Sequence, residues 1–251
     1  MVVNQNHMKH FKLIFLSLLL SSVFLQSCKD EVKDEPNPNS NLNVVFSHHV
    51  NNMALDFDTA KYTNALNQNF EVSTLRYFVS AIYLRKANGD SVLVKDIHYV
   101  DARDNTGVNI TKQVAAEEYV GLSLAFGIPA YLNQSGMFTI KPESNMEWPE
   151  PMGGGYHYMK FEGKFAKEDN SVQNFQMHSG PLMAMDRSIY FTFDTAINLS
   201  NDATVTINQH LEKWMTSPND LDLKDITMIM GNPEVQGKIM ANGHDVITLS
   251  Q

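Results

Sequence analysis

Residues 70–85, FEVSTLRYFVSAIYLR, are the stretch that decides the fold. Apolar side chains alternate along it, and this alternation places one set on a single face of a strand: Leu75, Tyr77, Val79, Ala81 and Tyr83. The opposite face is apolar as well, since it carries Phe78, Ile82 and Leu84. Strands that are apolar on both faces are typical of the buried centre of a sheet. The stretch therefore predicts the central strand of a β-rich domain.

The β pattern continues on both sides of this strand. The tripeptide NGD at 88–90 signals a tight turn, after which residues 91–102 return as the second strand of a hairpin. An earlier strand is predicted at 43–50, NVVFSHHV, where Val44, Phe46, His48 and Val50 share a face. Further strands are predicted at 119–126, 136–140, 155–165, 172–178, 188–198 and 203–207.

Helical patterns occur mainly near the C-terminus. Residues 208–215, NQHLEKWM, are long enough for two helical turns. In residues 232–243, Asn232 is a good N-cap, Pro233 suits the first helical position and Gly243 follows the last. The predicted fold class is all-β, a β-sandwich with short helical additions near the C-terminus.

Residues 1–27 are predicted to be a lipoprotein signal peptide. Lys9 and Lys12 stand at the start of a short apolar run, and no acidic residue precedes Asp30. The run is too short for a spanning helix. It ends in LQSC at 25–28, which resembles a bacterial lipobox and implies cleavage before Cys28 and lipid attachment to it. Cys28 is the only cysteine, so the fold has no internal disulfide and depends on its core.

Residues 28–41 are predicted to be a disordered tether, because they are charged and then rich in proline and asparagine. Their charged start resembles the surface-export signal of Bacteroidota lipoproteins. We therefore expect an outer-membrane lipoprotein anchored through the lipid on Cys28, either displayed on the cell surface or held at the periplasmic face. Residues 42–251 are predicted to form the β-sandwich domain. Losing the signal removes two lysines and no acid, which lowers the formal charge from −9 to −11 and disfavours nucleic acid as a partner.

Five blocks of the domain occur in the order found in one known family. They are FSHHVNNMALDFD at the start of residues 46–90, YVGLSLAFGIPAYLNQSG at 119–136, NMEWPEPMGGGYHYMKFEG at 145–163, FQMHSGP at 175–181 and MGNPEVQGKIMANGHD at 230–245. Together they resemble the MbnP-like copper-binding domain, over about residues 42–250. The resemblance implies a β-sandwich, export and copper.

The family also suggests a ligand set and a partner. Some members bind copper through imidazoles together with a chemically modified tryptophan, and others are encoded beside a di-haem, peroxidase-like partner protein. This chain departs from the pattern, because Trp148 is followed by Pro149 and Glu150 instead of a second tryptophan. The paired cysteines of some branches are missing too. Both departures weaken the transfer of a tryptophan-derived ligand.

Four histidines are candidate metal ligands, since imidazoles suit copper and no domain thiolate is present. His178 is the first, because it lies on the polar face of its predicted strand and matches the family's H-x-G block, and the alternative for it is a hydrogen-bonded structural histidine at a strand end. His48 is the second, and the alternative for it is a hydrogen-bonded core residue. His49 is expected to point to the opposite face of the strand. The sequence does not show which of His48 and His49 points into the site. His157 is a weaker candidate, expected on the apolar strand face of Met159 and Phe161.

Trp148 is expected to form a wall of the site or to be the modified residue, with a hydrophobic plug as the alternative. Methionines flank the same blocks: Met146, Met152, Met159, Met177, Met183 and Met185. Thioethers bind soft metals, but they also fill irregular cores.

The sequence holds no phosphate loop, zincin motif, nucleophile elbow or dinucleotide fingerprint, so we expect no enzyme. The predicted function is that of an exported, lipid-anchored protein that binds or scavenges copper. The alternative is a surface β-sandwich that binds a glycan or a protein without metal, with Trp148 and the tyrosines as its platform. The metal's oxidation state and the oligomeric state stay open.

Overall fold

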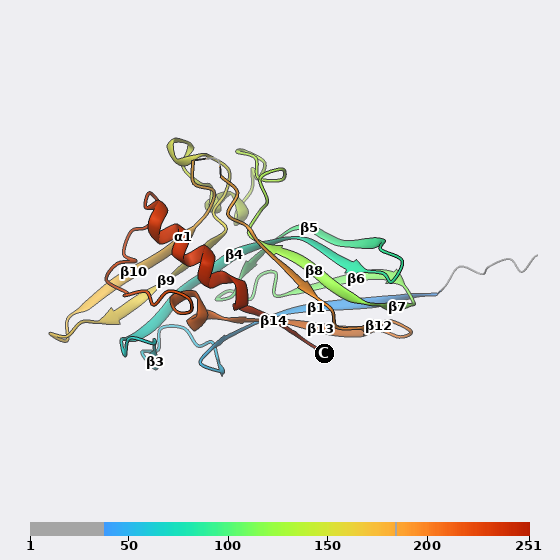
Figure 1. The fold of residues 1–251 in the computed structure, drawn as a ribbon, viewed down its shortest axis with the longest axis horizontal. Helices are drawn as coiled ribbons and strands as arrows, with labels where there is room; N and C mark the ends of the chain where they lie inside the picture. The colour runs from blue at the N-terminus through green and yellow to red at the C-terminus, as the bar shows by residue number, and fades with distance from the viewer. Residues whose placement is uncertain (1–37, 184) are drawn as a thin grey trace, which may run out of the picture. The chain divides into compact units, whose positions relative to one another are not determined.

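A computed structural model describes residues 38–183 and 185–251. This part of the chain forms two main β-sheets and a single α-helix near the C-terminus, which confirms the predicted fold class (Figure 1). No helix within it is long and apolar enough to span a membrane. The predicted signal peptide, Cys28 and most of the predicted tether lie outside the described residues.

The strands and helices have the following bounds. The strands are β1 (Asn39–Val50), β2 (Met53–Ala54), β3 (Tyr62–Thr63), β4 (Asn69–Arg85), β5 (Ser91–Asp101), β6 (Asn109–Ala115), β7 (Glu118–Tyr119), β8 (Gly121–Phe126), β9 (Met159–Ala166), β10 (Val172–Ser179), β11 (Ile189–Phe193), β12 (Ile197–Asn198), β13 (Ala203–His210) and β14 (Ile247–Ser250). The α-helix is α1 (Pro233–Asn242), and the 3-10 helices are η1 (Glu143–Met146), η2 (Glu150–Met152), η3 (Leu211–Met215) and η4 (Gly243–Asp245).

The first sheet has the strand order β14-β13-β1-β2, with β6 also paired to β1. Strands β1 and β13 are parallel and in register from Leu42 opposite Ala203 to His49 opposite His210. The second sheet has the order β10-β9-β4-β8-β11, with β3 and β5 also paired to β4. The main core lies between the sheets, because inward side chains of both sheets form one buried cluster.

Strand β4 is the centre of the second sheet, as its sequence predicts. Residues 70–77 pair with β9, and residues 79–85 pair with β8. At the division, the Phe78 N–H donates to the Tyr158 carbonyl and the Phe78 carbonyl accepts from the Gly127 N–H. The segment between β8 and β9 leaves the sheet at this point and projects beyond it (Figure 1).

A bulge changes which residues of β4 face the main core. The pairing register shifts near Ala81, whose φ is 49°. One extra residue reverses the alternation of side chains, so Ile82 and Leu84 join the main core on the side of Tyr77. The predicted division of faces is therefore wrong beyond Ser80. Phe78 packs on the other side, in a second apolar cluster with Tyr156 and Tyr158.

Several boundaries differ from the prediction. Strand β1 begins at Asn39, inside the predicted tether, because residues 39–41 pair their backbone with β6 although their side chains are polar. No strand forms at 136–140. Residues 208–210 extend β13, so the predicted helix at 208–215 is reduced to the single 3-10 segment η3.

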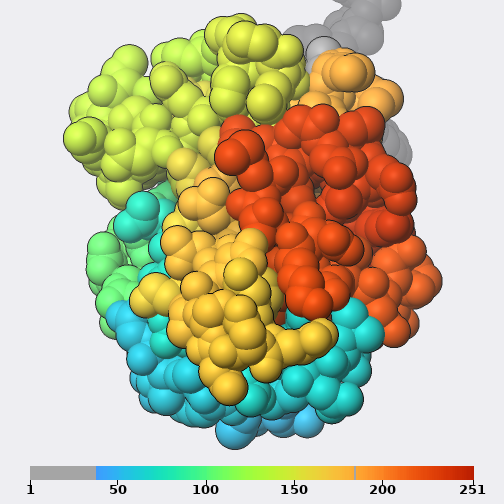
Figure 2. Space-filling model, turned by 90° about the vertical axis from the view of Figure 1, so that its left-hand side faces the viewer, coloured from blue at the N-terminus to red at the C-terminus, as the bar shows by residue number. Residues whose placement is uncertain are grey.

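Helix α1 has the predicted start. The Asn232 side chain accepts from the backbone N–H groups of Glu234 and Val235, and Pro233 is the first helical residue. The helix packs beside the β9–β10 hairpin, as the red and yellow surfaces of Figure 2 show, and the Gln236 amide donates to the His178 carbonyl at 2.6 Å. Helix α1 therefore holds the backbone of His178, which is one of the candidate metal ligands.

Candidate metal centre

The loop that carries Trp148 is held by its own backbone. Gly153, Gly154 and Gly155 all have positive φ values, which lets the chain reverse within three residues. The reversal brings the Trp148 N–H to the Gly155 carbonyl at 2.8 Å and pairs Glu147 with Tyr156. The glycine run of this stretch is thus a turn that fixes the place of the tryptophan.

The Trp148 ring is buried, with 2% of the residue exposed. It packs on Gly180, where an added Cβ would lie 2.5 Å from the tryptophan Cε3. The glycine of the H-x-G block is therefore required by close packing against Trp148. The indole Nε1 donates to the Met152 carbonyl at 3.3 Å.

His157 lies between Trp148 and His178. Its ring meets the Trp148 ring edge-on, with centroids 4.8 Å apart, and meets the His178 ring edge-on at 5.2 Å. We call Trp148, His157, His178 and Glu162 the imidazole cluster. The structure thus brings His178, His157 and Trp148 together.

The sequence misplaced His157. Alternation along a strand over 155–165 put it on the apolar face with Met159, but β9 begins only at Met159. The ring instead lies against Trp148 and His178, although it is buried as expected, with 4% exposed. The missed signal was the glycine turn, which delays the start of the strand.

Hydrogen bonds define the state of the His157 ring. Its Nδ1 lies 2.9 Å from the Met146 carbonyl, to which only an N–H can donate, so Nε2 carries the lone pair. Among the described residues, this buried Nε2 has no hydrogen-bond partner. Burial, followed by the Lys160 charge, lowers the pKa of His157 to about 3, so the ring stays neutral. A neutral imidazole whose other nitrogen is held by a carbonyl is the usual form of a metal ligand.

His178 is held from two sides. Its Nε2 lies 2.6 Å from Glu162 Oε1 on the neighbouring strand, and Gln236 binds its carbonyl. The hydrogen bond from His178 lowers the pKa of Glu162. Glu162 is in β9 and His178 in the neighbouring strand β10, so the bond joins the two strands.

His48 lies on the other side of the second sheet from His178. It points from β1 into the core, and its Nε2 is 2.8 Å from the Tyr77 hydroxyl. Register places Tyr77 opposite Met159 on the core face, whereas His178 lies opposite Lys160 on the outer face. The structure therefore does not bring His48 to His178. His49 points away from the core and contacts His210.

The flanking methionines serve mainly as packing or surface residues. Met146, Met159 and Met177 are fully buried in the apolar clusters, while Met183 and Met185 are exposed. The aromatic residues that would form an exposed platform are buried as well, namely Trp148, Tyr156 and Tyr158. The glycan- or protein-binding alternative therefore loses Trp148, Tyr156 and Tyr158 as an exposed platform.

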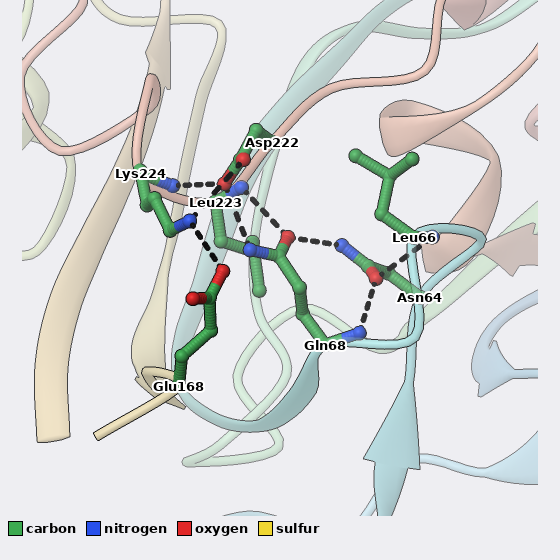
Figure 3. A network of polar contacts seen from close by, with 7 residues as sticks. All are labelled: Asn64, Leu66, Gln68, Glu168, Asp222, Leu223 and Lys224. Atoms are coloured by element: carbon green, nitrogen blue, oxygen red, sulfur yellow. Dashed lines mark hydrogen bonds and ion pairs between the residues drawn. The ribbon is translucent and has the colours of Figure 1, made fainter. Parts of the chain in front are cut away.

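Two cavities bear on the choice of site. One of about 310 Å³ is bounded by Glu147, Trp148, Glu150 and Gly155, so it reaches Trp148 from outside but is not lined by His157 or His178. A larger one of about 480 Å³ lies by the β3–β4 turn and is lined by polar side chains. There, Gln68 accepts from Asn64 and Leu223 and donates to Asp222 (Figure 3). The polar groups of this network satisfy one another's hydrogen bonds. We therefore assign to the network the structural role of holding the β3–β4 turn in place.

The imidazole cluster is not a closed set of metal ligands. In residues 38–183 and 185–251, no three or more His, Cys, Asp or Glu side chains are arranged to hold a metal ion. The cluster brings together two imidazole rings, those of His157 and His178. In His157, Nε2 is a buried lone pair with no partner among the described groups.

The comparisons with known proteins agree with one another. A family model described as MbnP matches residues 39–234. Among solved structures, MbnP from Methylosinus trichosporium is similar with a TM-score of 0.61 and 14% sequence identity, over 85% of this chain and 99% of that chain. At this identity the likeness shows the fold alone. No curated protein sequence matches the chain.

Proposed function

The chain belongs to the MbnP family, and from this premise we propose that it is a non-catalytic protein that binds copper through His157 and His178 beside Trp148. The observation that carries the proposal is the buried His157 Nε2, which has no partner among the described residues and lies in a ring contact with His178. Burying an unpaired nitrogen is costly unless a ligand fills its place. Imidazole nitrogens suit copper.

Three of the four predicted histidines can now be assigned a role, and the fourth, His49, lies apart in contact with His210. His178 and His157 are the proposed pair, and Glu162 and the Met146 carbonyl orient them through the opposite ring nitrogens. Trp148 forms the wall of the site. His48 is assigned to the core, because its Nε2 is bonded to Tyr77.

Copper titration tests this assignment. Cu(I) and Cu(II) are added to the wild-type protein and to His157→Gln, His178→Ala and the control His244→Gln, which changes an exposed histidine. We expect each cluster variant to lose at least about tenfold in affinity for the tightest-bound ion. Equal affinity in wild type and both cluster variants would remove the proposed pair. Elemental analysis of protein purified from its own envelope identifies the metal, and intact mass shows whether Trp148 is modified.

We also propose that Cys28 anchors the protein to the outer membrane by lipid. The lipobox-like LQSC supports this, and the charged stretch after it favours display on the cell surface. Labelling with a radioactive fatty acid should mark the wild type and not Cys28→Ser. Protease added to intact cells then distinguishes surface display from the periplasmic face, because only a surface protein is degraded.

A di-haem, peroxidase-like protein is the proposed partner, and family membership is its support. Affinity capture of the tagged protein from its own envelope, followed by haem staining, should reveal such a protein. Recovery without any haem-containing band would count against it.

A further inference from the structure

A second pair of histidines lies on the outer face of the first sheet. His49 in β1 and His210 in β13 are directly opposite each other in the parallel ladder. Their rings are stacked, with centroids 5.9 Å apart and an angle of 28° between the planes. We call them the cross-strand histidine pair, and we propose that it binds a divalent transition-metal ion independently of the imidazole cluster.

Hydroxyl groups orient both rings in the same way. His49 Nε2 is 2.8 Å from the Ser47 hydroxyl, and His210 Nε2 is 3.0 Å from the Thr248 hydroxyl. When each Nε2–H donates to its hydroxyl, each Nδ1 carries the lone pair. In that tautomer the two neighbouring imidazoles present the same nitrogen for coordination, and the hydroxyls act as the outer contacts that orient the rings.

The surroundings of the pair favour a cation. Glu212 follows His210 by two residues, and its carboxylate accepts the Asn51 N–H at 3.0 Å beside the end of β1. The nearby Lys213 is paired with Asp245 at 2.8 Å. The charge next to the pair is therefore mainly negative, which strengthens the binding of a positive ion.

The ligand type indicates which class of metal ion the cross-strand histidine pair would bind. The described residues include no group of three or more His, Cys, Asp or Glu that could hold a metal, so the protein supplies two imidazoles here and water completes the coordination. Imidazoles suit Zn²⁺, Cu²⁺ and Ni²⁺, whereas Mg²⁺ and Ca²⁺ prefer oxygen. A site with two protein ligands binds such ions more weakly than a closed site with four.

The pair is separate from the imidazole cluster. His49 lies on the outer face of the first sheet, because the preceding residue, His48, points into the core and alternation reverses the next side chain. His178 lies on the outer face of the second sheet. The core lies between them, so neither site depends on the ligands of the other.

Zn²⁺ is the probe for the test, because it has no redox chemistry. The protein labelled with ¹⁵N-histidine is titrated with Zn²⁺ and followed by NMR. We expect the Nδ1 resonances of His49 and His210 to shift together, and His210→Gln to weaken the response of His49 at least about tenfold. Ser47→Ala keeps both imidazoles but frees one ring, so it should give a similar loss.

Two controls make the outcome decisive. His244→Gln removes an exposed histidine elsewhere and should leave the His49 response unchanged, as should His178→Gln in the imidazole cluster. An unchanged His49 response in His210→Gln, or coordination through Nε2, would overturn the proposal. An equal loss in His244→Gln would reveal unspecific binding to surface histidines and would overturn it too. Because His178→Gln is followed separately, failure of the copper site leaves this result intact.

Discussion

The His157 ring stands edge-on to the His178 ring, with centroids 5.2 Å apart and planes at 82°. The two residues come from different parts of the chain, one from the end of the glycine turn before β9 and the other from β10. Their contact depends on close packing around Trp148, on the carboxylate of Glu162 and on helix α1. A single substitution can remove each of these three contacts separately.

Gly180→Ala should destabilise the protein by about 1–3 kcal/mol, because the added methyl group would overlap the Trp148 ring. Urea unfolding measures the loss. Gly237→Ala is the matched control, since the same methyl group in α1 would come no closer than 4.0 Å to Arg187. That control should be stabilising by about 0.5–1 kcal/mol, as expected for alanine in a helix. Equal effects of the two changes would contradict the packing argument.

Glu162→Ala should weaken copper binding about 10-fold to 100-fold, because His178 loses the carboxylate that orients its ring. Glu162→Gln keeps an acceptor oxygen at the same place and should restore part of the affinity. Competition with a copper chelator gives both values. Glu71→Gln is the control, since it removes a carboxylate of the same sheet that pairs with Lys164 instead. A similar loss in Glu71→Gln would mean that overall charge, and not the contact with His178, sets the affinity.

Gln236→Leu should lower the free energy of unfolding by about 1–3 kcal/mol, because its buried amide donates to the carbonyls of His178 and Ile229. Removing it leaves both acceptors without that donor. Chemical denaturation followed by circular dichroism measures the change. Gln251→Ala removes a comparable but exposed side chain-to-backbone bond, to Ala196, and should change stability by less than about 0.5 kcal/mol.

Acidification should lower stability through the partly buried His48 and His98, in addition to the buried His157. Burial, and then the charge of His49, lowers the pKa of His48 to about 4, and burial also lowers the pKa of His98. Between about pH 6.5 and pH 4 the unfolded chain binds protons at these residues while the folded protein does not, so the free energy of unfolding falls as pH falls through this window. Above pH 6.5 the contribution is fully present.

Urea unfolding at a series of pH values measures this dependence. In His48→Gln combined with His98→Gln, the slope of stability against pH should be smaller than in the wild type, whatever the absolute stability of the variant. An unchanged slope would show that other groups control the acid response.

The sequence predicted those features that depend on local patterns. The two apolar faces of residues 70–85 identified the central strand, and Asn232 and Pro233 placed the start of α1. Patterns could not reveal the bulge at Ala81, because one inserted residue reverses the alternation without changing composition. They also could not show that Asn39 begins a strand, since backbone pairing with β6 needs no apolar side chain.

The candidate site was predicted only in part. His178 and Trp148 were placed at the site by the family resemblance, and the structure brings them together around His157. The contact between His157 and His178 arises from a turn and from register across two strands, which a linear pattern does not contain. His48 shared the residue type of a ligand, but its Tyr77 partner is 29 positions away in the chain. The metal-binding roles of these histidines stay predictions.

The two hydrogen bonds of Phe78 give the molecule a modular character. Its N–H and carbonyl bind Tyr158 and Gly127, so one residue of the central strand closes both ends of the whole excursion between β8 and β9. We therefore expect changes in the length of that excursion to leave the pairing of β4 with β8 and β9 in place.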